Sequence, residues 1–318
     1  MNNFKKIGLT ALAGSLVATS VFAGELSVTG SASLEFAHVS GGALNDGKSY
    51  TMGNSVNLDG SGELDNGWTV AVNYELDQGS SYSTTGPFDN NSLTLGMGDF
   101  GTVKFSGHGG SSAASAVDDT TGSYWDIKGT TTNPATGDTS ENMMSYNNSM
   151  IDGVSITASY VPHSATVNSS SIDAAIAYTG IDGLVVGVAR GENNGGLKAT
   201  HAKVETWYAN YTYGSVKVAY HTNDYTTSEV SDTSDQGFSA YSISYTVTPE
   251  ISVSYGSNTV ESTAISTDID QEVEAFKASY TAGGMGISAS MGTIDNAGFS
   301  SATTADESWW DIDLSFAF

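Results

Sequence analysis

The chain has 318 residues, with 35 acidic side chains against 10 basic ones, a formal net charge of −25 and no cysteine. This balance argues against nucleic acids and anionic membrane surfaces as partners, since both are bound through clustered lysine and arginine. The lack of cysteine excludes disulfide frameworks, thiolate metal sites and thiol catalysis. The 16 Tyr, 11 Phe and 5 Trp residues distinguish the chain from disordered acidic segments, so we expect it to fold.

The chain starts with a segment typical of a secretory signal peptide. Lys5 and Lys6 precede an apolar stretch, and Ala23 supplies the small residue of a cleavage site. We expect residues 1–23 to be removed, which leaves residues 24–318 as one exported domain. A membrane anchor is the alternative, but it needs about 20 apolar residues and a flanking stop signal.

Beyond this segment, the main pattern is an alternation of apolar and polar residues with a period of two. Such alternation sends apolar side chains to one face of a strand and polar side chains to the other. No later window is long and apolar enough to cross a bilayer as a helix. The pattern predicts sixteen strands, over 26–36, 56–64, 68–76, 93–97, 103–105, 143–147, 154–160, 172–178, 184–188, 207–213, 216–220, 241–247, 251–255, 276–280, 285–291 and 310–318.

The connections between these segments alternate in length. Seven are short and carry turn residues, as at 65–67 and 282–284, whereas eight are longer and polar, the longest over 107–141. All four prolines lie in connections, where a missing backbone donor disrupts no strand pairing. The even strand number and the alternating connections predict antiparallel strands with both chain ends on the short-turn side.

Two features favour a closed barrel in a membrane over a soluble sandwich. The apolar face has aromatic residues near strand ends, such as Trp68, Tyr160 and Tyr280, as expected at two membrane interfaces. The other face carries acids whose unpaired burial would be unfavourable, so it should face water. A sheet in lipid must close on itself to pair every backbone group. We therefore predict an all-β fold, a 16-stranded antiparallel transmembrane β-barrel wide enough for an aqueous channel.

Three segments carry a family resemblance. The expected mature chain starts with GELSVTGSASLEF, contains FGTVKFSGHGGSSAASAVDD and finishes with DIDLSFAF. Across the whole expected mature chain, it resembles the general outer-membrane porins of Gram-negative bacteria, most of all those of the alphaproteobacterial type. The resemblance implies a homotrimer, surrounded by outer-membrane lipids, that passively conducts ions and small hydrophilic solutes. It also implies that the last strand, with Trp310, Phe316 and Phe318, is the signal for assembly into the outer membrane.

The third long connection, 107–141, lies where these porins fold a loop inward to narrow the pore. About 35 residues without periodicity are unusual in a compact domain and are more often functional than idle. By position and charge, Asp118, Asp119 and Asp126 are expected to line this constriction. Ordinary solvated loop acids are the alternative, because acids are abundant throughout the chain.

Strand parity also assigns charged side chains to the water-filled face. The set contains seven acids and three lysines: Glu35, Asp59, Glu63, Glu75, Asp173, Asp311, Asp313, Lys104, Lys217 and Lys277. The only arginine, Arg190, lies at the outer end of a strand, so the basic cluster that faces the loop in many general porins is missing. An excess of acids in a lumen raises the local cation concentration, and we expect a cation-preferring pore.

Enzymatic and metal-dependent functions are disfavoured. The five histidines are scattered without metal-ligand spacing, and no GxSxG nucleophile motif occurs, so neither an enzyme nor a cofactor is expected. The acid pairs Asp118-Asp119 and Asp268/Asp270 could bind Ca²⁺ with loop carbonyls, although no EF-hand pattern supports this. The alternative function is a structural or adhesive surface barrel whose long loops bind a partner, and single-channel conductance would separate it from a diffusion channel.

Overall fold

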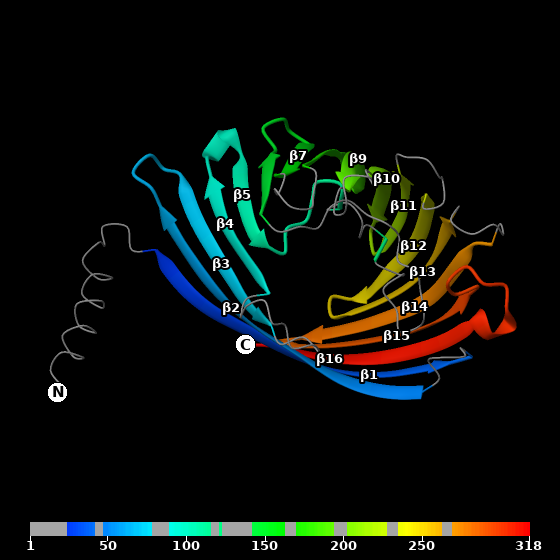
Figure 1. The fold of residues 1–318 in the computed structure, drawn as a ribbon. Helices are drawn as coiled ribbons and strands as arrows, with labels where there is room; N and C mark the ends of the chain where they lie inside the picture. The colour runs from blue at the N-terminus through cyan, green and yellow to red at the C-terminus, as the bar shows by residue number, and fades with distance from the viewer. Residues whose placement is uncertain are drawn as a thin grey trace, which may run out of the picture.

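The strands form one closed antiparallel barrel (Figure 1). The computed structural model describes residues 24–41, 47–77, 89–115, 121–122, 142–162, 170–193, 202–227, 235–262 and 269–318. Each strand pairs with its neighbours in the sequence, and the first strand pairs with the last to close the sheet. The sixteen strands are β1 (Glu25–Ser40), β2 (Gly47–Glu63), β3 (Thr69–Asp77), β4 (Asn90–Gly96), β5 (Thr102–His108), β6 (Met143–Asn148), β7 (Val154–Val161), β8 (Ser171–Ile181), β9 (Leu184–Asn193), β10 (Ala202–Tyr213), β11 (Val216–Thr227), β12 (Gln236–Thr248), β13 (Ile251–Ser262), β14 (Gln271–Ala282), β15 (Met285–Asp295) and β16 (Glu307–Ala317).

This topology confirms the predicted fold class and strand number. In the described part of the chain, two short 3-10 helices, η1 (Gly98–Phe100) and η3 (Thr303–Ala305), lie in connections. Within the described ranges, no helix combines the length and apolar character needed to cross a membrane.

Several strands are longer than predicted at the ends that join the long connections. β10 begins at Ala202 instead of residue 207, β14 begins at Gln271 instead of residue 276, and β2 begins inside the connection predicted over 40–48. At these ends the outward side chains are charged, as Lys203 and Glu272 show, so the apolar-outward pattern used for prediction no longer applies.

The short turns form as their residues predict. Leu64 and Trp68 close the β2–β3 turn through a backbone hydrogen bond of 2.7 Å, and the Asn66 side-chain oxygen accepts a further bond from the Trp68 backbone nitrogen at 3.1 Å. In the β8–β9 turn, Gly183 has a φ of +73°, and a Cβ there would overlap the carbonyl oxygen of Thr212. Only glycine combines this backbone conformation with so close an approach.

The outer face carries an apolar band with aromatic side chains along one margin. The rings of Trp207 and Tyr220 have centroids 5.1 Å apart, and those of Tyr255 and Phe276 are 4.8 Å apart. Pairing between strands continues the row from Phe276 to Trp310 through β15. Amphipathic rings of this kind suit the boundary between hydrocarbon and headgroups.

The last residue joins β16 to β1. The backbone groups of Phe318 exchange two hydrogen bonds with Gly30, at 2.8 and 2.9 Å. The Phe318 ring lies over Gly30, where a Cβ would approach the ring to 2.6 Å. Trp310, Phe316 and Phe318 are all exposed, and the role of these side chains in assembly stays a prediction.

Candidate functional site

The strand register places all ten predicted lumen residues on one face of the sheet. Side chains directly opposite each other in neighbouring antiparallel strands share a face. Glu35 lies opposite Asp313 across β1 and β16, and Lys217 and Lys277 belong to one row that crosses β11 to β14. The opposite face is the apolar outer band, so this set faces the barrel interior. Their effect on conduction stays a prediction.

An acidic sector of the inner face spans β16, β1, β2 and β3. Besides the six predicted acids on β1 to β3 and β16, the register adds Glu25 and Asp77. Sequence analysis missed these two because they are the first residue of β1 and the last of β3, just beyond the predicted strands. On the described residues of these four strands, the lysine is Lys48, and it lies opposite His38 on the outer face. The inner face here is therefore negative.

Neutral donors hold several of these carboxylates in place. Asn73 Nδ2 donates to Asp59 Oδ1 at 2.8 Å, and Asn90 Nδ2 donates to Glu75 Oε2 at 2.6 Å. On the other side of the sector, the Ser290 hydroxyl donates to Asp311. Hydrogen bonds from amides and hydroxyls orient a carboxylate without cancelling its charge. The sector keeps its negative charge along the inner wall.

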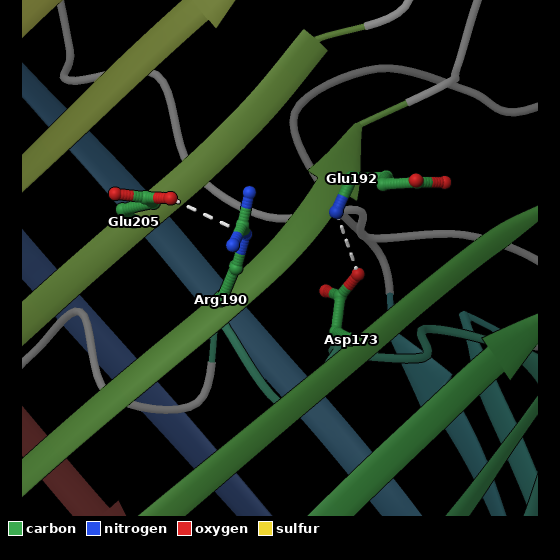
Figure 2. A network of polar contacts seen from close by, with 4 residues as sticks. All are labelled: Asp173, Arg190, Glu192 and Glu205. Atoms are coloured by element: carbon green, nitrogen blue, oxygen red, sulfur yellow. Dashed lines mark hydrogen bonds and ion pairs between the residues drawn. The ribbon is translucent and has the colours of Figure 1, made fainter.

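One predicted lumen acid is enclosed in the wall. Asp173 is only 1% exposed, and its Oδ1 accepts a hydrogen bond from the Glu192 backbone nitrogen at 2.9 Å (Figure 2). Gly191 makes room for it, because a Cβ there would overlap the Asp173 carboxyl group. On the outer face, Arg190 Nε of β9 pairs with Glu205 Oε1 of β10 at 3.2 Å. Asp173 thus ties β8 to β9, and it is too covered to offer its charge to a solute.

The three inner lysines lie apart from the acidic sector. Lys104 is on β5, Lys217 on β11 and Lys277 on β14, and their direct neighbours across the strands are serine or threonine. Positive and negative side chains therefore occupy different parts of the inner wall.

The start of the third long connection contacts this wall. The backbone nitrogen of Ala113 donates to the Ser159 hydroxyl on β7 at 2.9 Å. Ala113 and Ala114 are buried in a cluster with apolar side chains of β8, β9 and β10, among them Val204. This part of the connection therefore lies against the inner face.

A second described part, residues 121–122, contacts β14. Lys277 Nζ donates to the carbonyl oxygen of Gly122 at 2.9 Å. The predicted constriction acids lie outside the described residues: Asp118, Asp119 and Asp126. Their place in a constriction stays a prediction.

The predicted calcium pairs are mostly outside the described residues too. Asp118, Asp119 and Asp268 fall in those gaps, while the backbone oxygen of Asp270 accepts a hydrogen bond from Asn296 Nδ2 at 3.0 Å. Among the described residues, no three His, Cys, Asp or Glu side chains gather as metal ligands would.

The inner face near the long connections is covered and in part apolar, which differs from the water-filled face expected from the sequence. Val273 and Ile294 are fully buried against Ala297 of the β15–β16 connection. Phe299 of the same connection is buried against Phe238 and its neighbours on β12 and β13. The connection between β15 and β16 thus folds over the inner wall. The apolar residues of this otherwise polar connection were the sequence feature that could have predicted this contact.

Hydrogen bonds to β14 and within the connection hold it in place. Gly298 donates its backbone N–H to Gln271 Oε1 at 3.2 Å, and Ala297 donates to the carbonyl oxygen of Ala305 at 2.9 Å. Phe299 has a φ of +61°, a conformation that is unusual for a bulky residue. Burial of its ring offsets this backbone strain.

Comparisons with known proteins agree with the fold. The sequence model of a family described as Gram-negative porins matches residues 8–318. A search of curated proteins returned no match. Among solved structures, the anion-selective porin of Comamonas acidovorans aligns with a TM-score of 0.71 and 14% identity, covering 93% of this chain and 100% of that one. A mutant of the Rh. blastica porin aligns with a TM-score of 0.66 and 17% identity, covering 92% and 100%. At such identities these structures show the shared fold alone.

Proposed function

Because the chain belongs to the Gram-negative porin family, a family of channels for passive diffusion, we propose that it forms an outer-membrane pore that prefers cations. The Comamonas acidovorans relative is described as anion-selective, but at 14% identity it says nothing about the charges of this lumen. Selectivity has to follow from the side chains of this chain. Catalysis is no part of the proposal, since the family's members are channels and not enzymes.

The observation that supports cation preference is the acidic sector of the inner wall. It contributes Glu25, Glu35, Asp59, Glu63, Glu75, Asp77, Asp311 and Asp313, against three lysines on the inner face of the other described strands. Fixed negative charges along a narrow water-filled path raise the local concentration of cations and lower that of anions. A potassium ion should therefore cross more readily than a chloride ion.

Neutralising an opposed pair of acids tests this. In the double variant Glu35→Gln/Asp313→Asn, the ratio of potassium to chloride permeability should fall, by on the order of tenfold at most. The measurement is the reversal potential of the purified protein in a planar bilayer under a salt gradient. The matched control is Glu205→Gln/Asp224→Asn, which removes two carboxylates that also lie directly opposite each other, but on the outer face.

Three outcomes would count against this proposal. A native pore that prefers anions would contradict the proposal, as would a control variant that changes selectivity as much as the inner-face variant. A barrel that inserts into the bilayer but carries no current would instead favour the adhesive or structural function.

Assembly and export complete the proposal. We propose that residues 1–23 are removed on export, that three chains associate in the outer membrane, and that the third long connection narrows the pore with Asp118, Asp119 and Asp126. The support for a constriction is the contact of its described parts with β7 and β14. The support for the trimer is that porins of this family are known as trimers.

A further inference from the structure

The apolar band on the outer face is hollowed between β13 and β16 (Figure 1). The hollow has a volume of about 440 Å³, and its outward side chains are all apolar, among them Val253, Phe276 and Met291. Inward-facing residues such as Ser290 complete the lining with main-chain atoms, because their side chains are on the other face of the sheet. Small-molecule sites have volumes of about 300–1,000 Å³. This hollow opens on the face that contacts hydrocarbon, so the group that fills it has to be apolar.

Two neighbouring alanines form the floor of this hollow. Ala278 on β14 lies directly opposite Ala289 on β15. The same row continues to Val253 on β13 and to Ile312 on β16. Because a methyl group fills little space, the two alanines leave a gap between the valine and the isoleucine. This gap is the alanine notch.

Larger side chains frame the alanine notch on both sides along the strands. Phe276 lies opposite Met291 in the row nearer the long connections, and Tyr280 lies opposite Ile287 in the row nearer the short turns. Phe276 and Met291 are each 61% exposed, so they project from the wall. The notch is therefore a depression in the outer face and not a flat stretch of it.

A second hollow, of about 380 Å³, adjoins the first on the side of the long connections. Phe276, Met291 and Trp310 line both hollows, which makes them continuous. The second hollow also extends to Ser40 and Glu274, so it is partly polar. Together the two hollows form one groove with an apolar end in the hydrocarbon band and a polar end at its margin.

One row of side chains supplies most of the polar end. It crosses four strands and consists of Glu274, Thr293, Ser308 and Ser40, each directly opposite the next. The Ser40 and Ser308 hydroxyls are hydrogen-bonded at 2.9 Å. The Glu274 carboxylate interacts with the Tyr255 hydroxyl, and its two oxygens, with about four acceptor positions, can accept further hydrogen bonds. The row therefore presents hydroxyl groups beside a carboxylate.

His38 adds an acceptor at the same end. Its Nδ1 lies 2.6 Å from the carbonyl oxygen of Gly47, and a carbonyl can only accept, so Nδ1 carries the proton. The Nε2 of the neutral ring is then an acceptor. The ring centroid lies 6.0 Å from that of Trp310, which brings His38 next to the apolar part of the groove.

The polar end is lined by hydroxyls and acceptors and not by cations. Among its described lining residues there is no lysine or arginine, and Lys48, opposite His38, is not one of them. The connections 42–46 and 263–268, which join β1 to β2 and β13 to β14, contain neither residue in their sequences. Phosphate groups are typically bound through arginine or lysine. Sugar hydroxyls both donate and accept, and they suit a row of hydroxyls and a carboxylate better.

We propose that this groove is a binding site for one glycolipid of the surrounding membrane. An acyl chain lies in the alanine notch, and the sugar headgroup lies on the row from Glu274 to Ser40. The groove is apolar where hydrocarbon surrounds the barrel and polar at the margin of that band, which is the order of groups along a lipid. The site is on the outer face, so it adds a ligand to the protein without depending on the selectivity of the lumen.

Native mass spectrometry of the full barrel in detergent tests the site with three lipids that have identical acyl chains. Monogalactosyl diacylglycerol is the glycolipid probe, and phosphatidylglycerol and diacylglycerol are the comparison lipids. The glycolipid should bind more tightly than either, on the order of tenfold, because only its headgroup matches the polar row. Equal binding of the three lipids would overturn the proposal, and so would tighter binding of phosphatidylglycerol.

Filling the alanine notch tests where the acyl chain lies. Ala289→Phe should weaken glycolipid binding on the order of tenfold, as expected when about two methylene groups lose their contacts. Ala278→Leu fills the same notch with less bulk and should act in the same direction, which keeps the test decisive if Ala289→Phe does not assemble.

The matched control is Ala209→Phe. Ala209 faces outward on β10 between Val186 and Tyr220, and it lines neither hollow. Its glycolipid affinity should stay at the native value. Equal weakening in Ala209→Phe and Ala289→Phe would show general contact with lipid instead of a site, and unchanged binding in both notch variants would also overturn the proposal.

The headgroup position is tested at the polar end. Glu274→Gln keeps the shape of the side chain but removes its charge, so glycolipid binding should weaken by about threefold to tenfold while diacylglycerol binding stays unchanged. Glu272→Gln is the control, because Glu272 faces outward on the same strand but does not line the groove. An equal loss in the two variants, or no loss in Glu274→Gln, would contradict the placement of the sugar.

A neighbouring subunit is the competing occupant of the groove. If a subunit filled it, Ala289→Phe would abolish the oligomers that survive on an unheated SDS gel, while glycolipid binding would stay as in the native protein. That result would overturn the proposal. Oligomers that persist in Ala289→Phe while glycolipid binding falls would support it.

Discussion

The inner face of the barrel has two halves of opposite character, and β14 contains both. Near the long connection, Val273 and Ala275 are 0% and 1% exposed and contact other apolar side chains. Towards the short turn, Lys277 and Ser279 on the same face line a pocket on the inner wall. One strand therefore passes from a dry half, covered by connections, to a wet half that borders the lumen.

The outer face changes in the opposite sense along the same strand. Glu272 and Glu274 face outward beside the long connection, whereas Phe276 and Tyr280 face outward closer to the turn. The alternation with a period of two continues, but the apolar residues face inward beside the long connection and outward near the turn. Hydrocarbon can surround only the part of the barrel where the outward residues are apolar, so the membrane contacts the half near the short turns. The outward charged residues near the long connections, such as Glu272 and Glu274, form a charged collar that lies outside the hydrocarbon.

The sharpest test of the two halves places the same acid in each. Val273→Asp should destabilise the barrel by roughly 2–5 kcal/mol, because a carboxylate would be buried among apolar side chains. Ser279→Asp, on the same strand and face, should fold normally because its carboxylate meets the lumen. The measurement is the temperature at which the folded band on an SDS gel is lost. Equal behaviour of the two variants would show that the halves do not differ.

The sequence was sufficient to predict the wet half and the apolar band around it. Strict alternation, as in 310–318, reflects the two solvents that a strand in a bilayer must meet at once, and turn residues such as Gly183 mark where the chain reverses. Strand number and closure followed from these two local signals, and so did the face on which Glu35 and Asp313 lie.

The dry half could not be predicted in the same way. Its residues alternate too, but Val204 and Phe238 face inward there because distant connections cover them. That cover depends on contacts between segments far apart in the chain, such as Phe299 on β12 and β13, and periodicity carries no information about such contacts. The enclosure of Asp173 was also missed, because it depends on the close approach of Gly191 on the neighbouring strand, which a period of two does not reveal.

A substitution with a smaller expected effect tests whether the β15–β16 connection covers the inner wall. Phe299→Ala removes the buried ring from the β15–β16 connection and should cost about 3 kcal/mol, the low end for a buried phenylalanine, because the effect is confined to that connection. The single-channel conductance should rise as the connection loosens from the inner wall. Phe100→Ala is the control, because Phe100 is a 68% exposed phenylalanine in the β4–β5 turn. A conductance that does not change in Phe299→Ala would mean that the connection leaves the ion path unaffected.

The smallest effect is expected on the charged collar of the outer face. Arg190→Gln breaks the ion pair with Glu205, whose two side chains are 69% and 59% exposed, so its stabilisation is below about 1 kcal/mol. Although this removes the only arginine, the reversal potential should stay at the native value, because the guanidinium group lies outside the lumen. A shift of the reversal potential as large as that of Glu35→Gln/Asp313→Asn would mean that charges on the outer face govern selectivity. The inner acidic sector would then not explain the cation preference.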